Sequence, residues 1–94
     1  MPYTLVRARV EEYPRWRRAF EEQAEAREEA GSRGGHLFRT ADDPDVVVVF
    51  LAWEDLDRAR TYLESEEARE TWKAGGLDDR PETLYLEELG RPSH

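Results

Sequence analysis

The chain has 94 residues, the size of one small domain, and such a domain buries little more than ~60% of the surface that its unfolded chain exposes. Its 22 acidic residues outnumber 14 basic residues that are spread along the chain, and with a net charge of −8 we expect no nucleic-acid partner. The absence of cysteine excludes disulfides and thiolate metal sites. Neither a secretion signal nor an apolar run near the ~20 residues of a membrane span is present, so we expect a cytoplasmic protein with no membrane partner.

The first third of the chain predicts a strand followed by a helix. Residues 3–10 alternate between two faces, which is the period of a strand. From Tyr13 the period becomes helical, and Pro14 suits the first turn of a helix. The stripe along one side of this helix consists of Tyr13, Trp16, Phe20, Ala24 and Arg27. The helix should end near Gly31, which supplies the left-handed residue that often follows a helix.

A hairpin is predicted next. Residues 34–40 and 45–53 have the composition of two strands, and the connector over 41–45 contains the Asp and Pro residues typical of a turn. The second of these strands has a particular pattern, because residues 46–53 read VVVVFLAW and are apolar on both faces. An antiparallel strand with one wet face would alternate apolar and polar residues. Both faces of this strand should therefore be covered.

A second helix and a last strand complete the pattern. Asp55 has the form of a helix N-cap, and Ser65 followed by two glutamates has the form of another. The second helix should therefore be kinked or rebuilt near Ser65, and Gly75-Gly76 should stop it. A turn over residues 78–81 then leads to a strand over 83–89.

The order β-α-β-β-α-β predicts a ferredoxin-like α+β fold, with a four-stranded antiparallel sheet and two helices on one face. We expect a single domain over residues 1–90 and a disordered tail over 91–94. The two helices suffice to cover one face only. A second copy of the same sheet would cover the other, which predicts a homodimer built as a dimeric α/β barrel. The alternative is that the Val-rich strand is central and merely very apolar.

Several motifs resemble one family over nearly the whole chain. They are Gly34-Gly35-x-Leu37-Phe38-Arg39, Asp42-Asp43-Pro44-Asp45, Trp53-Glu54-Asp55-Leu56 and Leu84-x-Leu86-Glu87-Glu88. This set resembles small proteins of the antibiotic-biosynthesis-monooxygenase-like dimeric α/β-barrel superfamily. The resemblance implies a homodimer with a pocket between sheet and helices in each subunit. It also implies a range of activities: cofactor-free oxygenation of polycyclic aromatics, haem degradation, isomerisation or cyclisation, and simple binding.

Two departures bear on the activity. If the resemblance extended to the haem-degrading branch of this superfamily, it would imply an asparagine on the first strand and a haem-ligating histidine on the second helix. The chain contains no asparagine, and its predicted second helix contains no histidine. Haem degradation therefore ranks below the other activities. The cofactor-free oxygenases use Asn, Trp, Tyr and Arg around an aromatic substrate, and only the last three types occur here.

His36 and Tyr62 are the candidate catalytic residues. His36 is the only histidine outside the tail, and histidine is the side chain whose ordinary pKa lies near neutrality. A lone histidine on a strand is more often structural. Tyr62 lies one position off the apolar stripe of the second helix, so its hydroxyl could reach a cavity and bond a substrate carbonyl or phenol. Packing with a solvated hydroxyl is the alternative.

The candidate ligand-binding residues are Trp72, Arg39, Phe38 and Tyr85. Trp72 precedes the glycines that end the second helix, which suits a pocket wall, whereas Trp16 and Trp53 are expected in the core. Arg39 could neutralise a carboxylate or enolate, although an ion pair with a nearby acidic residue is the favoured interpretation for it and for Arg7. No metal site is expected, because the histidines have no partner at ligand spacing and residues 42–45 lack the rest of a calcium loop.

These observations lead to one functional hypothesis and one competitor. The first is a homodimer that binds a small apolar or aromatic molecule and acts without cofactor as a monooxygenase, isomerase or cyclase on an aromatic or polyketide-like substrate. The second is a non-catalytic ligand-binding or protein-interaction module of the same fold. An enzyme requires polar side chains that converge on one ligand atom, whereas a binding module requires only a matching shape.

Overall fold

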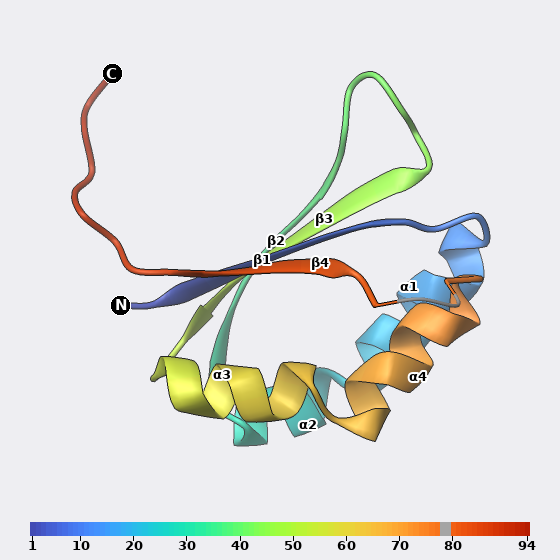
Figure 1. The fold of residues 1–94 in the computed structure, drawn as a ribbon, viewed down its shortest axis with the longest axis horizontal. Helices are drawn as coiled ribbons and strands as arrows, with labels where there is room; N and C mark the ends of the chain where they lie inside the picture. The colour runs from blue at the N-terminus through green and yellow to red at the C-terminus, as the bar shows by residue number, and fades with distance from the viewer. Residues whose placement is uncertain (78–79) are drawn as a thin grey trace.

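A computed structural model describes residues 1–77 and 80–94 (Figure 1). The described residues form four strands and four helices. In chain order they are β1 (Tyr3–Arg9), α1 (Tyr13–Glu22), α2 (Ala24–Glu29), β2 (Ser32–Arg39), β3 (Val46–Trp53), α3 (Leu56–Leu63), α4 (Glu66–Ala74) and β4 (Glu82–Leu86). None of the described helices is long and apolar enough to cross a membrane.

The four strands form one antiparallel sheet in the order β2-β3-β1-β4, and the helices lie together on one side of it (Figure 1). This arrangement confirms the predicted ferredoxin-like α+β fold. Strands β2 and β4 are the two edges of the sheet, and β3 and β1 are central. The predicted single domain over residues 1–90 stays a prediction, as does the tail.

The strand register decides which side chains share a face. Val6 pairs with Val49, which pairs in turn with Leu37, and this row points toward the helices because Val6 and Val49 are both buried. The neighbouring row joins Leu5 and Phe50, and because side chains alternate along a strand it lies on the opposite face. We call this opposite side the open face. Strand β3 thus presents apolar side chains to both sides, as its sequence predicts.

The core lies between the sheet and the helices and is built around two tryptophans. Trp16 of α1 and Trp53 of β3 are fully buried, as predicted for both. The ring of Trp16 lies 5.1 Å from the ring of Phe20 and 5.2 Å from that of Trp72. The indole Nε1 of Trp53 donates a 2.8 Å hydrogen bond to Oγ1 of Thr4, which is also fully buried. Large aromatic side chains thereby fill the centre of this small core.

The predicted helix ends are confirmed. Asp55 caps α3 by accepting a 2.8 Å hydrogen bond from the Arg58 amide, and Ser65 caps α4 by accepting one from Ala68. The interruption near Ser65 therefore divides the predicted second helix into α3 and α4. Gly31, which follows α2, has φ of 108°, a backbone conformation that favours glycine.

Three predicted boundaries were wrong or incomplete. The helix predicted from residue 13 to the vicinity of Gly31 is broken at Gln23, whose amide bonds to the Phe20 carbonyl three residues back. Strand β2 begins at Ser32 rather than residue 34, through an irregularity in its pairing with β3. Strand β4 ends at Leu86 rather than residue 89. The predicted turn over residues 78–81 falls partly outside the described residues.

The buried bond between Trp53 and Thr4 generates a prediction about stability. Thr4→Val keeps the shape of the side chain but leaves the indole N–H without an acceptor, and an unsatisfied buried donor costs about 1–3 kcal/mol. We expect urea unfolding to show a loss of that size in the free energy of unfolding. Thr4→Ser, which keeps an acceptor, should lose less. Equal losses in the two variants would mean that the methyl group, not the hydrogen bond, stabilises this part of the core.

Candidate functional site

A large cavity lies at the β4 edge of the sheet, between β4 and the helices α3 and α4. It measures about 580 Å³. We call it the α4–β4 cavity. Its walls come from the end of α3, from α4, from the connector that follows α4 and from β4. The lining residues are Leu63, Glu64, Ser65, Glu66, Arg69, Trp72, Lys73, Leu77, Arg80, Pro81, Thr83 and Tyr85. A space of this size lies within the range of small-molecule sites.

Two of the predicted ligand-binding residues, Trp72 and Tyr85, line this cavity together. Trp72 is held by its contact with Trp16 and is only 7% exposed. Tyr85 pairs with the buried Thr4 across β1 and β4, so its ring points to the helix side of the sheet. The guanidinium of Arg60 lies 4.5 Å from the centre of that ring. The role of Trp72 and Tyr85 in binding stays a prediction, but both side chains line the same cavity.

The cavity has basic groups that the sequence patterns did not single out. Arg69 and Lys73 are four residues apart on α4, which places them on the same side of the helix. Lys73 Nζ lies 3.8 Å from a carboxylate oxygen of Glu70, a loose pair on the protein surface. Glu64 and Glu66 also line the cavity, so its charge is mixed. An acidic chain thus gathers cations along one wall of this cavity.

The hydroxyl of Tyr85 is available as a hydrogen-bond donor at neutral pH. Burial raises the pKa of Tyr85 above its ordinary value, the Glu64 carboxylate raises it further, and Arg60 opposes both. The neutral phenol is therefore the form present near pH 7. A phenol donates one hydrogen bond and accepts others, so Tyr85 can bond an oxygen of a molecule in the cavity.

Tyr62 occupies a different place, in a shallow apolar groove between α2 and α3. The groove measures about 480 Å³ and includes Ala26 and Ala30. The Tyr62 hydroxyl lies 3.5 Å from Oε1 of Gln23. Burial raises the pKa of Tyr62, and the nearby guanidinium of Arg27 opposes this effect. Tyr62 does not line the α4–β4 cavity.

His36 and Phe38 lie on the open face of the sheet. His36 pairs with Phe50 and Phe38 with Val48, and the His36 and Phe38 rings stack 5.8 Å apart. Phe38 is 53% exposed. His36 and Tyr62, the two candidate catalytic residues, therefore lie on opposite sides of the sheet within one chain, and the catalytic role of each stays a prediction.

Arg39 shares a small cavity with Phe38 and lies apart from the other candidates. The cavity measures about 190 Å³ and includes Tyr13 and Trp16, and the Arg39 guanidinium lies 5.7 Å from the centre of the Tyr13 ring. Arg39 belongs to β2, the edge strand farthest from β4 in the sheet. Arg7 pairs with Glu82 across β1 and β4, a neighbour suited to the predicted ion pair. Within one chain, the six predicted site residues thus do not gather at a single site.

Comparison with known proteins identifies the family. A family model described as antibiotic biosynthesis monooxygenase (ABM) matches residues 4–74, from β1 to the end of α4. No curated protein matches the chain.

Solved structures agree with the fold. A Bordetella bronchiseptica protein, provisionally named an antibiotic biosynthesis monooxygenase, superposes with a TM-score of 0.76 at 16% identity, over 94% of this chain and 96% of that one. One from Deinococcus radiodurans, with the same provisional name, gives 0.73 at 16% identity over 100% and 98% of the two chains. A conserved protein from Methanosarcina mazei Go1 gives 0.70 at 13% identity over 93% and 91%.

These identities are low, and the structures therefore establish the fold alone. The family model carries the assignment, because it matches well over half of the chain. The chain belongs to the antibiotic biosynthesis monooxygenase family.

Proposed function

We propose that this ABM-family chain binds a small hydroxylated aromatic compound in the α4–β4 cavity and oxygenates it without a metal or organic cofactor. One observation carries the proposal: aromatic walls and cations line the same cavity. Trp72 and Tyr85 offer flat apolar surface, and Arg69 and Lys73 offer positive charge to an oxyanion. The family name supplies the class of reaction. The cytoplasm is the proposed compartment.

The chemistry requires the substrate to provide the electrons. A phenol or enol that loses its proton becomes electron-rich enough to reduce O₂, the oxidant. Oxidation of a ring carbon to a carbonyl then consumes one O₂: one oxygen atom forms the new C=O bond, and the other leaves as water with two hydrogens from the substrate, one from its hydroxyl and one from that ring carbon. Cations beside the substrate oxygen stabilise the anion, and preorganised charge of this kind often lowers the barrier more than any other effect in an active site. Arg69 and Lys73 are proposed for this role, with Tyr85 donating a hydrogen bond.

A competing function is non-catalytic binding of the same class of ligand. The position of His36 favours this non-catalytic function. His36 lies on the open face and is not among the described residues that line the α4–β4 cavity. The proton acceptors in that lining are the carboxylates of Glu64 and Glu66. Oxygen consumption separates the two functions.

We further propose that the protein is a homodimer in which two open faces pack together. The apolar side chains of this face are Tyr3, Leu5, Phe38, Val48, Phe50, Ala52, Leu84 and Leu86. Phe38 and Leu84 are 53% and 46% exposed, although both are large and apolar. A contiguous exposed patch of this kind marks an interaction surface. A second copy of the chain offers a matching surface in shape and chemistry.

The dimer can be tested with two adjacent valines. Light scattering at tens of micromolar should give twice the chain mass of 11.0 kDa. Val48→Asp places a carboxylate on the open face and should yield a folded monomer by circular dichroism. Val47→Asp places it in the helix-side core, where Val47 is 3% exposed, and should unfold the chain. A monomeric parent protein would refute the proposed dimer.

Ligand binding can be tested with 2-naphthol and its methyl ether, which cannot ionise. A ligand at one hundred times its Kd stabilises by about 2.7 kcal/mol. That corresponds to a shift of several degrees in Tm for a domain of this size. We expect 2-naphthol to give the larger shift. Lys73→Met should weaken naphthol binding a few-fold, in line with ~0.2–1 kcal/mol for a half-exposed ion pair, and should leave the ether unaffected.

Arg18→Met is the matched control, because it removes one exposed cation from α1 and leaves the cavity lining intact. Equal effects of the two variants would show that only net charge matters.

Catalysis can be tested by oxygen consumption. Addition of a hydroxylated aromatic compound that binds should cause uptake of O₂, and Tyr85→Phe should slow this uptake. Binding of several such compounds with no O₂ uptake from any of them would assign the non-catalytic function.

A further inference from the structure

Arg27 of α2 is a buried cation. The residue is only 9% exposed, and it lies on the stripe of the helix that packs toward the sheet. Its Nη1 donates a 2.7 Å hydrogen bond to the Phe20 carbonyl, and its guanidinium lies 3.6 Å from the centre of the Phe20 ring. Burial lowers the pKa of Arg27, and the Tyr62 hydroxyl partly offsets this effect. A guanidinium nevertheless stays protonated in proteins, so the charge remains.

This charge has no carboxylate partner among the described residues. Ion pairs within 4.0 Å engage most of the other arginines, but none involves Arg27. The Glu21 carboxylate, whose field reaches Arg27, is paired at 2.6 Å with Arg17. The contacts of Arg27 are with a carbonyl, a ring and a phenol, all of which are neutral. Buried charges in proteins are ordinarily paired, because removing an ion from water costs several kcal/mol. An unpaired one in a chain with 22 acidic residues needs an explanation.

A cleft adjoins this cation at the β2 edge of the sheet. It measures about 410 Å³, and Arg27 and Phe20 both line it. Leu37 and Leu51 give it an apolar side, Ser32 contributes a hydroxyl, and His36 also lines it. We call it the Arg27 cleft. It lies at the edge of the sheet opposite the α4–β4 cavity and shares no lining residue with it.

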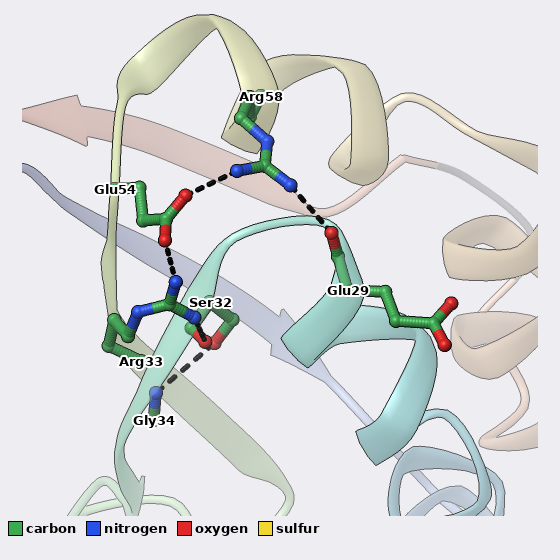
Figure 2. Close-up of polar contacts among 6 residues, drawn as sticks. All are labelled: Glu29, Ser32, Arg33, Gly34, Glu54 and Arg58. Carbon is green, nitrogen blue, oxygen red and sulfur yellow. Dashed lines mark hydrogen bonds and ion pairs between the residues drawn. The ribbon is translucent and has the colours of Figure 1, made fainter.

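The second arginine of the cleft, Arg33, already has a carboxylate partner. Figure 2 shows that Arg33 forms an ion pair with Glu54, which also pairs with Arg58. Arg58 in turn donates a 2.6 Å hydrogen bond to the carbonyl of Glu29 at the end of α2. The carboxylate of Glu29 points away from this network in Figure 2. The network ties the end of α2 to the starts of β2 and α3, and it leaves Arg27 as the cation of the cleft without a counter-ion.

We propose that the Arg27 cleft is a second binding site, for an organic acid with a compact apolar body and one carboxylate, which pairs with the Arg27 guanidinium. A guanidinium binds a carboxylate through two parallel hydrogen bonds. Phe20, Leu37 and Leu51 would contact the apolar body. The carboxylate of Glu28 also lines the cleft and disfavours a dianion such as phosphate. This site is independent of the function proposed for the α4–β4 cavity.

The test compares benzoate with benzamide, which has the same shape without the charge. Both are titrated into the protein labelled with ¹⁵N, at pH 8, above the range in which histidine ordinarily takes up a proton. Benzoate should shift the amide resonances of residues 27–28 and 32–37 and should bind at least tenfold more tightly than benzamide. Arg27→Met should remove this difference, and Arg27→Lys should keep part of it. Arg18→Met, the same change at an exposed position of α1, should leave it unchanged.

Two results would overturn the proposal. One is equal binding of benzoate and benzamide by the parent protein, and the other is a set of shifts confined to residues 63–73 and 83–85 around the α4–β4 cavity. The unfolding curve of Arg27→Met shows whether this variant still folds. Because Arg27→Met removes a buried unpaired charge and also removes the hydrogen bond to the Phe20 carbonyl, the two effects oppose each other and we expect the free energy of unfolding to change little. Equal binding of benzoate and benzamide, together with a large loss of stability in Arg27→Met, would make Arg27 a structural residue.

Discussion

The constraint on which the structure depends is that its sheet has two faces and its chain has helices for only one. Packing against the helices sets the position of Trp16 and Trp53, and the hydrogen bond from Trp53 to Thr4 satisfies the one polar group that such packing buries on β3. The other face keeps its apolar side chains without a cover from the same chain. The apolar character of β3 on both sides follows from this division, because a central strand contributes side chains to the middle of both faces.

The same constraint determines where the cavities lie. Aromatic side chains fill the centre of the helix-side core, so space is left at the two edges of the sheet, beside β4 and beside β2. Each edge space has an apolar wall from the core and a cation from a helix: Lys73 at one edge and Arg27 at the other. The electrostatics differ, however. Lys73 is exposed and loosely paired with Glu70, whereas Arg27 is buried and lacks a carboxylate within the described part of the chain.

Much of the fold could be predicted from the sequence, because strand period, capping residues and glycine stops are local signals. Asp55 and Ser65 reveal helix starts through their own side chains. The break at Gln23 has no such signal, since glutamine is a good helix former. The site was harder to predict. His36 pairs with Phe50 in the hairpin, but residues 46–53 are apolar on both faces, so their sequence does not say which face the helices cover.

The cations were missed for a related reason. Arg69 and Lys73 resemble the solvated side of any surface helix, and only the position of β4 beside them makes them part of a cavity. Arg27 did carry a signal, because it falls on the stripe of Trp16 and Phe20. A charged residue at a core position is informative where an exposed one is not.

The break at Gln23 has a further consequence, for motion. It leaves α2 with six residues, fewer than an isolated helix needs to persist in water, so α2 depends on its neighbours for its conformation. Two of the bonds that hold it are those from Arg27 to the Phe20 carbonyl and from Arg58 to the Glu29 carbonyl. Segments held by few such contacts open locally at a lower free energy than the whole domain unfolds. Amide hydrogens of α2 should therefore exchange with solvent before those of β1 and β3, so the buried charge lies on a segment that opens locally.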